Sequence, residues 1–357
     1  MAKKVQKNLS LMKGNEALAE AAVQAGCRFY AGYPITPQNE IPEFMSRRMP
    51  EVGGVFIQAE SELAAINMVY GAAAAGVRAM TSSSSPGISL KQEAISFMAA
   101  AELPAVIVNI QRGGPGLGNI TGSQGDYFQA VKGGGHGDYY CIVYSPFNLQ
   151  EMWDLTMCSF DKADEYRIPV IILGDGVVGQ MMEPFDQKKY IRPKLPPKDW
   201  VLDGCKGRKP RVIRSLHMVP GGLEEHNLKL IKKYDNIKKK EVLFDEYFTE
   251  DASLIVIGFG IAARIALSAV KKLRDEGKRI GLFRPVTLFP FPSQQIRKRA
   301  HKNTRFLVVE MNAGQMVEDV RLSVNGASEV LFFGKPGGAV FNPDELYQKI
   351  KGTYRKP

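Results

Sequence analysis

The sequence predicts an α/β protein: a parallel sheet covered by helices on both faces, followed by a second, smaller α/β unit. Between residues 14 and 175, short apolar segments alternate with longer segments rich in helix formers. Several apolar segments carry hydrophobic side chains at consecutive positions, which is typical of strands buried on both faces. The same alternation returns after Ser253. Strands separated by helices indicate parallel pairing in each unit.

The first unit begins with a predicted helix over Asn15–Ala25, which ends at the glycine that follows it. Strand and helix then alternate, and the serine-rich segment Ser82–Gly87 is predicted to be a turn. The predicted strands are Arg28–Ala31, Val55–Ala59, Val77–Thr81, Ala105–Ile110, Tyr140–Tyr144 and Pro169–Leu173, and the further helices are Glu62–Ala75, Leu90–Ala101 and Leu149–Ala163.

The pattern weakens between residues 176 and 250, where prolines interrupt any long element. A lysine-rich helix is expected there over Leu223–Tyr247. The second unit is predicted to contain strands at Leu254–Ile257, Arg279–Phe283 and Phe306–Val309, with helices at Ile261–Asp275 and Gly314–Val324. We therefore expect three parts: residues 1–180 as the larger α/β domain, 181–250 as a connector with a basic helix, and 251–357 as the smaller α/β domain.

The net charge of the 357-residue chain is +10, and the excess of Lys and Arg collects at residues 188–240. No nucleic-acid motif accompanies these residues, so we expect a solvated surface or one that faces an acidic subunit. A basic protein that binds nucleic acid stays as an alternative. No apolar run is long enough to span a bilayer, and the basic N-terminus leads into no apolar segment of a signal peptide, which favours a cytoplasmic protein without a membrane anchor.

The cysteines and histidines are scattered along the sequence. No two of the four cysteines have C-x-x-C spacing, and the four histidines are not clustered. Zinc and iron–sulfur clusters need closely spaced ligands of these types. We therefore expect this chain alone to bind no metal.

Two polar segments follow neighbouring predicted strands. In Ala31–Glu40, Thr36 lies between Pro34 and Pro37, which stiffen the backbone around its hydroxyl group. Glu62 lies where the next strand meets its helix, beside the apolar run Leu63–Ile66. A poorly solvated carboxylate needs a partner that can share a proton. The alternative is a glutamate that only interacts with the dipole of its helix.

Arg112 stands in a glycine-rich loop at the end of a predicted buried strand. The loop lacks the Lys-Ser/Thr pair of a P-loop. A guanidinium group at the carboxyl end of a strand suits a substrate carboxylate, although an ordinary exposed arginine is the alternative.

Gly258–Ala263 imitates part of a dinucleotide-binding turn, because it follows a strand and opens a helix. The acidic residue expected at the end of the next strand is missing, since that strand ends at Arg284 and Pro285. Tight turning alone explains these glycines. An NAD-dependent dehydrogenase stays as a more distant alternative.

Several segments in consistent order resemble the alpha chain of 2-oxoacid:ferredoxin oxidoreductases. The sequence most resembles the branched-chain (2-oxoisovalerate) type of this family, and next the 2-oxoglutarate type. The serine turn departs from the pattern, because Ser85 replaces a glycine that is frequent in the family. The matching segments are Gly14–Ala17, Gly32–Pro37, Gln58–Glu62, Thr81–Gly87, the Arg112 loop, His136–Asp138, Gly174–Gly176, Arg284–Pro292 and Val309–Met316.

The resemblance implies a pyrimidine-binding domain for thiamine diphosphate in the first unit and a transketolase C-terminal-like domain in the second. It implies that Glu62 pairs with the aminopyrimidine ring, that Tyr33, Pro34, Ile35 and Thr36 line the cofactor, and that Arg112 faces the substrate carboxylate. Glu62, Thr36 and Arg112 would be the catalytic residues.

The implied reaction is oxidative decarboxylation, in which a 2-oxoacid, coenzyme A and oxidised ferredoxin give acyl-CoA, carbon dioxide and reduced ferredoxin. The family places magnesium and the diphosphate site on a beta chain, and iron–sulfur clusters on partner chains. The implied partners are therefore that beta chain, a gamma chain, a ferredoxin-like iron–sulfur chain and ferredoxin. This chain would be inactive without them.

Overall fold

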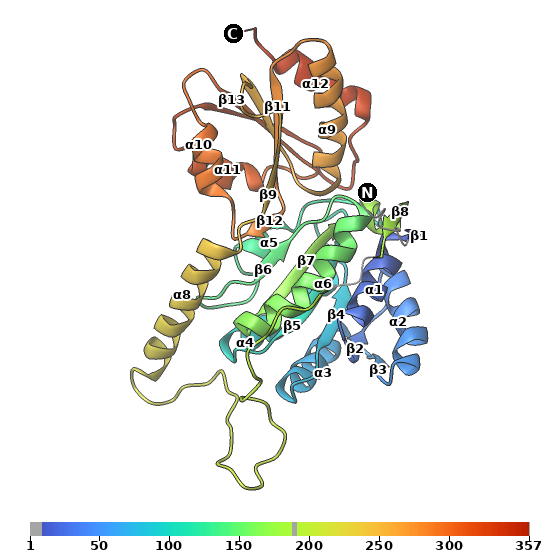
Figure 1. The fold of residues 1–357 in the computed structure, drawn as a ribbon, viewed down its shortest axis with the longest axis vertical. Coiled ribbons are helices and arrows are strands. Elements are labelled where there is room, and N and C mark those ends of the chain that lie inside the picture. The colour runs from blue at the N-terminus through green and yellow to red at the C-terminus, as the bar shows by residue number, and fades with distance from the viewer. Residues whose placement is uncertain (1–8, 188–190, 357) are drawn as a thin grey trace, which may run out of the picture.

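The computed structural model describes residues 9–187 and 191–356, so Lys188, Lys189 and the basic N-terminal residues lie outside the described part. Two α/β units lie one above the other along the longest axis (Figure 1). The helices are α1 Gly14–Gln24, α2 Glu40–Glu51, α3 Glu62–Ala74, α4 Pro86–Ala100, α5 Tyr127–Val131, α6 Leu149–Tyr166, α7 Gly176–Gln180, α8 Gly222–Lys240, α9 Gly260–Asp275, α10 Ser293–Arg299, α11 Met316–Val324 and α12 Pro343–Thr353. The strands are β1 Leu9–Lys13, β2 Phe29–Gly32, β3 Val55–Gln58, β4 Ala79–Ser83, β5 Ala105–Gln111, β6 Ile142–Tyr144, β7 Pro169–Asp175, β8 Met182–Asp186, β9 Phe244–Tyr247, β10 Leu254–Ile257, β11 Ile280–Pro285, β12 Thr287–Phe289, β13 Arg305–Glu310 and β14 Glu329–Gly334.

The first unit is built on a seven-stranded sheet in the order β12-β6-β7-β5-β4-β2-β3. All pairs are parallel except β12–β6. Every residue of β5 is buried. Val106 and Val108 pack in the hydrophobic cluster that includes α1 and α6, whereas Ile107 packs in the cluster that includes α3, α4 and α8. The sheet is therefore covered on both faces, as its consecutive apolar residues predicted.

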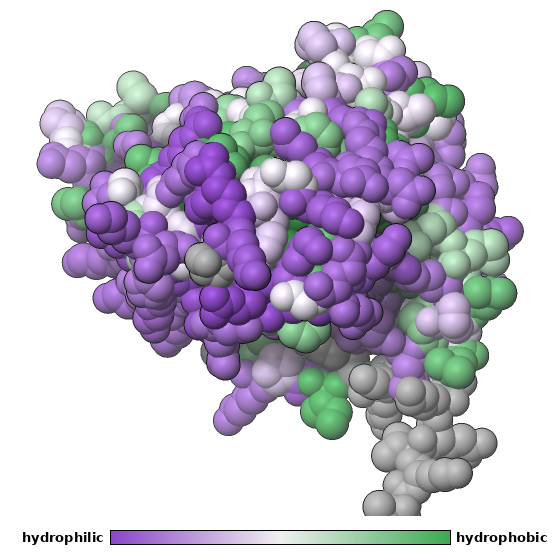
Figure 2. All heavy atoms as spheres, turned by 90° about the horizontal axis from the view of Figure 1, so that it is seen from above, coloured by the Kyte–Doolittle hydropathy of each residue, from purple (hydrophilic) through white to green (hydrophobic). Residues whose placement is uncertain are grey.

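The second unit is a five-stranded sheet in the order β14-β13-β10-β11-β9. Its strands are parallel except β9, which pairs antiparallel with β11 at the edge. Residues of α9 and α12 pack in one hydrophobic cluster, and residues of α10 and α11 in the other. Seen from above, the face of the molecule is largely hydrophilic (Figure 2). The predicted α/β class with a second, smaller α/β unit is confirmed.

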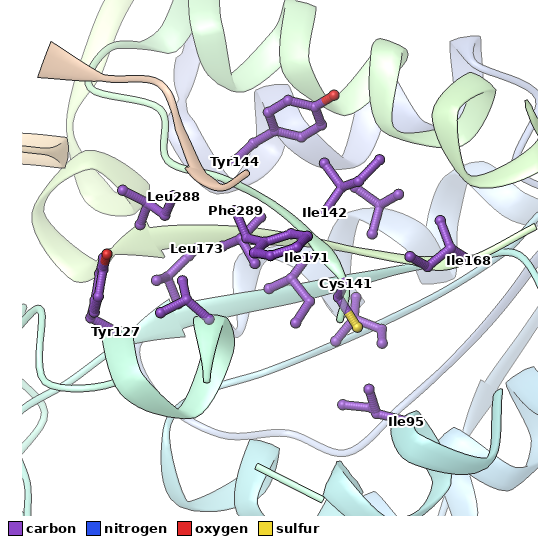
Figure 3. Packing of buried hydrophobic residues seen from close by; sticks show 14 of the residues in the cluster. Ile95, Tyr127, Cys141, Ile142, Tyr144, Ile168, Ile171, Leu173, Leu288 and Phe289 are labelled. Carbon is purple, nitrogen blue, oxygen red and sulfur yellow. The ribbon is translucent and has the colours of Figure 1, made fainter. Parts of the chain in front are cut away.

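One strand from the later part of the sequence, β12, belongs to the sheet of the first unit. Thr287 and Phe289 of β12 pair with β6 of the first sheet. Leu288 and Phe289 lie among Ile142, Ile171 and other buried residues of the first unit (Figure 3). The chain thus returns from the second unit to the edge of the first sheet. The domain limits at residues 180 and 250 stay a prediction.

Three local predictions are wrong. The basic helix α8 ends at Lys240, not at Tyr247, because Phe244–Tyr247 forms the edge strand β9. Pro86 and Gly87 are not in a turn but are the first residues of α4, where proline fits because its missing N–H needs no partner. The predicted helix over Gly314–Val324 begins at Met316.

Several elements were not predicted, and α2 is the clearest case. Its Ile41, Met45 and Met49 are buried at a spacing of four residues, so the helical periodicity was present in the sequence. No helix in the described ranges has the length and apolar character needed to cross a membrane.

Candidate functional site

The predicted site residues lie at the carboxyl edge of the first sheet. Thr36 follows β2, Glu62 follows β3 and Arg112 follows β5, while β4 lies between β5 and β2. Parallel strands present their carboxyl ends on one edge, and ligands of α/β sheets bind there. The topology therefore gathers residues that are up to 76 positions apart in the sequence.

Arg112 and Thr36 are in direct contact. Nη1 of Arg112 donates to the carbonyl oxygen of Thr36 at 3.0 Å, and Nη2 donates to the carbonyl oxygen of Leu117 at 2.9 Å. Nε is buried and has no hydrogen-bond partner in the described residues. Only 9% of Arg112 is exposed, so it is not the ordinary exposed arginine of the alternative interpretation. A buried guanidinium with an unused donor suits an anionic ligand.

Glu62 is buried, with 6% of the residue exposed, as its apolar neighbours predicted. The N-cap of α3 is Ser61, whose hydroxyl accepts from the N–H of Ala64 at 3.1 Å. Helix capping is thus done by the residue before Glu62. Within the described residues no hydrogen bond to the Glu62 carboxylate is found, and its oxygens are not among the fully buried side-chain atoms that lack a partner. The carboxylate therefore stays open to solvent or to a ligand at the edge of a largely buried residue. Glu62 is poised for a ligand that supplies a hydrogen-bond donor.

A glycine makes room for this carboxylate. A Cβ atom on Gly87 would lie 2.4 Å from Oε1 of Glu62 and 2.0 Å from Oγ of Ser83. The first turn of α4 thus faces the carboxylate without a side chain between them. Ser83 and Ser84 are fully buried, and their hydroxyl groups have no partner in the described residues. The unpartnered hydroxyl of Ser83 therefore lies beside the Glu62 carboxylate.

Ser85 has an unusual backbone conformation. Its φ is +24°, in the left-handed region that favours glycine. Its hydroxyl donates to Oδ2 of Asp126 at 2.6 Å and accepts from the backbone N–H of Arg112 at 3.0 Å. The side chain of Ser85 therefore ties the start of α4 to the Arg112 loop.

The remaining predicted cofactor residues occupy the turn after β2. Tyr33 and Pro34 are exposed, and Ile35 and Thr36 are half-buried. The turn is held from inside by Gln38, whose amide donates to the carbonyl oxygen of Tyr33 at 3.3 Å. The structure brings this turn to Arg112 through Thr36. In the described part of the chain, no hydrogen bond joins Tyr33, Pro34 or Ile35 to Glu62.

Two buried residues of the site were missed from the sequence. Gln38 accepts a hydrogen bond from Ser82, and Lys91 donates to the carbonyl oxygen of Glu62. A fully buried lysine gives little signal in a sequence, because lysine is almost always exposed. The described residues contain no group of three or more His, Cys, Asp or Glu side chains that could hold a metal ion.

The glycine turn at residues 258–263 has a structural partner. Oδ2 of Asp175 accepts from the backbone N–H of Ile261 at 2.9 Å, at the N-terminus of α9. A Cβ on Gly260 would lie 2.7 Å from the same oxygen. In a dinucleotide fold the pyrophosphate sits at this end of the helix. Here a carboxylate of the chain occupies it, which speaks against NAD binding.

Comparison with known proteins agrees with this architecture. Residues 20–243 match the family described as "Pyruvate flavodoxin/ferredoxin oxidoreductase, thiamine diP-bdg", and residues 252–346 match "Pyruvate:ferredoxin oxidoreductase core domain II". Among curated relatives, the ketoisovalerate oxidoreductase subunit VorB of Methanothermobacter thermautotrophicus is 50% identical over 96% of this chain and 97% of its own length. The 2-oxoglutarate synthase subunit KorA of Methanothermobacter marburgensis is 40% identical over 96% of this chain and 98% of its own length.

A solved structure shows the same fold. The 2-oxoglutarate:ferredoxin oxidoreductase from Magnetococcus marinus, with 2-oxoglutarate, coenzyme A and succinyl-CoA bound, superposes with a TM-score of 0.85 at 25% identity. The match covers 97% of this chain and 65% of that chain. The present chain therefore spans about two thirds of that longer polypeptide.

Proposed function

This chain belongs to the 2-oxoacid:ferredoxin oxidoreductase family, and from that premise we propose that it is the subunit that binds the aminopyrimidine end of thiamine diphosphate in a branched-chain 2-oxoacid enzyme. The complete enzyme would oxidatively decarboxylate 2-oxoisovalerate with coenzyme A and ferredoxin. The identity of 50% to VorB, against 40% to KorA, favours the branched-chain substrate over 2-oxoglutarate.

The observation that supports the proposal is the carboxylate of the largely buried Glu62, which accepts no hydrogen bond from the described residues. An aminopyrimidine ring offers a nitrogen that can share a proton with it, so the residues present fit this end of the cofactor. Gly87 leaves the space in front of Oε1 open. When bound, thiamine diphosphate supplies the carbanion chemistry of decarboxylation. Glu62 would hold and move the proton at the ring nitrogen.

Arg112 and the turn after β2 would orient the 2-oxoacid. The free Nε of Arg112 and its remaining Nη hydrogens suit a carboxylate, and its bond to Thr36 places both residues at one side of the site. The turn Tyr33–Thr36 would line the cofactor. Because these groups are fixed by the chain before a ligand arrives, little reorganisation is needed on binding.

The rest of the active site would come from other chains. We place magnesium and the diphosphate groups on a beta chain, iron–sulfur clusters on a ferredoxin-like chain, and add a gamma chain and ferredoxin as further partners. We place the complex in the cytoplasm, and its basic connector against an acidic neighbour.

The test uses the complex purified with its partner chains. Glu62→Gln should lower thiamine- and CoA-dependent viologen reduction by about a hundredfold or more, the range for loss of a proton-transferring group. Glu60→Gln changes an exposed glutamate two residues away and should leave the rate unchanged. Full activity of Glu62→Gln would disprove the assigned role. A wild-type preference for 2-oxoglutarate over 2-oxoisovalerate would overturn the branched-chain assignment.

A further inference from the structure

The Arg112 loop folds back on itself between residues 112 and 122. The backbone N–H of Asn119 donates to the carbonyl oxygen of Gly113 at 2.9 Å, and the N–H of Gly113 donates to the carbonyl oxygen of Thr121 at 3.0 Å. These bonds close a narrow tongue after the carboxyl end of β5. The loop therefore has a shape of its own, and its contacts with other segments decide where it lies against the candidate site.

The guanidinium group of Arg112 is held between two carbonyl oxygens from different segments. Nη1 donates to Thr36, in the turn after β2, and Nη2 donates to Leu117, within the loop. A planar group that is held at two points has a fixed orientation, and a shift of either carbonyl oxygen turns it. The position of the loop thus enters the geometry of the group that is assigned to the substrate carboxylate.

The side chain of Asn119, two residues after Leu117, reaches the second unit. Its Nδ2 donates to the carbonyl oxygen of Gly337 at 2.7 Å, in the segment that follows β14. Its Oδ1 accepts from the backbone N–H of Thr121 at 3.1 Å and from the hydroxyl group of the same residue at 2.6 Å. Because the N–H of Thr121 can only donate, it fixes the amide with Nδ2 toward Gly337. One side chain therefore completes the loop and ties it to the second unit.

A second amide secures the chain directly after the loop. Gln124 is fully buried. Its Nε2 donates to the carbonyl oxygen of Phe259 at 2.7 Å, and its Oε1 accepts from the N–H of Met311 at 3.0 Å. These two partners follow β10 and β13, which are neighbouring strands of the second sheet. The second unit thus holds the loop at Asn119 and again just beyond its end.

The contact between the loop and the second unit leaves no space for a methyl group. A Cβ atom on Gly338 would lie 2.1 Å from Oγ1 of Thr121 and 2.5 Å from Oδ1 of Asn119. From the loop side, a Cβ atom on Gly113 would lie 2.9 Å from the backbone of Gly337. Glycines on both sides therefore let the two segments approach each other at backbone distance.

We propose that Asn119 is a positioning residue for substrate binding: through it, the second unit holds the loop whose Leu117 carbonyl oxygen orients the Arg112 guanidinium group. The inference rests on the proposed function, in which Arg112 faces the carboxylate of the 2-oxoacid. It gives the second unit a part in substrate binding, although the candidate site residues themselves come from the first unit.

The experiment compares two alanine variants in the second unit, by steady-state kinetics of the assembled complex with 2-oxoisovalerate. Gly338→Ala places a methyl group against the loop, whereas Gly326→Ala places one where nothing lies within 4 Å. The φ angles of the two glycines are +81° and +76°, so both variants carry the same kind of backbone strain. Gly338→Ala should raise the KM for the 2-oxoacid by roughly threefold to tenfold with little change in kcat, as for loss of one uncharged hydrogen bond. A KM that rises equally in both variants, or in neither, would overturn the proposal.

Asn119→Asp makes the corresponding change from the loop side. It keeps an oxygen for the donors of Thr121 and loses the N–H that reaches Gly337. The KM for the 2-oxoacid should therefore rise as in Gly338→Ala. Asn67→Asp on α3 is the matched control, because that exposed amide donates to a carbonyl oxygen of its own helix. If Gly338→Ala does not assemble, Asn119→Asp decides alone, and an unchanged KM overturns the proposal.

A double variant separates positioning from general support of the fold. Arg112→Met removes the guanidinium group and should lower kcat/KM for the 2-oxoacid by about tenfold or more. If Asn119 acts through Arg112, adding Asn119→Asp should lower kcat/KM no further. A further loss equal to that of the single Asn119 variant would overturn the proposal.

The same variants distinguish this inference from the function on which it rests. A loss of kcat/KM in Arg112→Met together with an unchanged KM in Asn119→Asp would overturn the role of Asn119 alone. An unchanged kcat/KM in Arg112→Met would instead show that the proposed function assigns the wrong residue to the substrate carboxylate.

Discussion

The carboxylate of Asp175, at the end of β7, accepts from the backbone N–H of Ile261 at 2.9 Å and so closes the N-terminus of α9 in the other unit. Its second oxygen accepts from the N–H of Val178 at 3.0 Å and caps α7. One side chain thus accepts hydrogen bonds at the N-termini of two helices, one in each unit. Because it is buried, it also acts as a link between them.

Asp175→Asn should destabilise the chain by about 1–3 kcal/mol, because one helix N–H would then face an amide N–H₂. Burial raises the pKa of Asp175 to about 6. A carboxyl group whose pKa is raised by folding adds to the stability of the folded state. This contribution is fully present below the pKa of the unfolded chain, near 3.8, and is lost as the pH rises through 6. The difference in unfolding free energy between the wild type and Asp175→Asn should therefore become smaller between pH 4.5 and 7.5.

Denaturant unfolding of the purified chain measures this difference, with Asp275→Asn at the exposed end of α9 as the control. Equal stability of Asp175→Asn and the wild type at pH 4.5 would contradict the capping role.

Gly87→Ala should impair the candidate site without unfolding the chain. The added methyl group would lie 2.4 Å from Oε1 of Glu62, so the carboxylate must turn away. We expect the affinity of the assembled complex for thiamine diphosphate to fall by about tenfold or more, as for loss of one hydrogen bond to a charged group.

Gly71→Ala on α3 is the matched control, because nothing lies within 4 Å of the new Cβ. It should stabilise the helix by roughly 0.5–1 kcal/mol and leave the affinity unchanged. An unchanged affinity in Gly87→Ala would mean that the Glu62 carboxylate is not needed where the structure places it.

Strands buried on both faces were predictable from the sequence, and strands at the edges were not. Ala105–Ile110 is apolar at nearly every position, which marks β5 without reference to any other segment. In contrast, β12 has three residues, and its partner β6 lies more than 140 positions earlier in the chain. β9 likewise becomes a strand by pairing with β11, after a lysine-rich helix whose periodicity extended toward it. Long-range pairing decides such segments.

The site divides in the same way. Thr36, Glu62 and Arg112 each follow a predicted strand, so strand order alone put them on one edge. Lys91 and Asp175 were not predictable in their roles, because each acts on a segment that folding brings from elsewhere. The contact of Ser85 with the Arg112 loop was likewise not predictable, because the two segments are 27 positions apart in the chain.

Lys233→Met should loosen α8 from the first unit. Its ammonium lies 2.7 Å from Oε1 of Glu102, which also pairs with Lys229. Although burial works against the charged form, the two lysines hold the pKa of Glu102 at about 2. A carboxyl group whose pKa is lowered by folding adds to the stability of the folded state. This contribution is present above the pKa of the unfolded chain, near 4.5, and is lost as the pH falls through 2.

Because Lys229 remains, we expect a loss of about 1–3 kcal/mol in unfolding free energy at pH 7, below the cost of breaking a whole buried pair. The difference should narrow as pH falls below 4. Lys232→Met, on the exposed side of α8, is the control and should change stability by less than about 0.5 kcal/mol. A Lys233 variant as stable as this control would show that α8 is held by its apolar residues alone.

Arg112→Lys should raise the KM for the 2-oxoacid more than it lowers kcat. Lysine keeps the charge but cannot bridge the carbonyl oxygens of Thr36 and Leu117 while presenting further N–H groups in a plane. Losing one hydrogen bond to a carboxylate corresponds to a rise of roughly tenfold to a hundredfold. Steady-state kinetics of the assembled complex with 2-oxoisovalerate measures both constants, and Arg47→Lys on the exposed side of α2 is the control.

A fall in kcat with an unchanged KM would place Arg112 in the chemical step instead of in substrate binding. An equal rise in the KM for coenzyme A would show that the loop orders the whole site rather than the carboxylate of the 2-oxoacid.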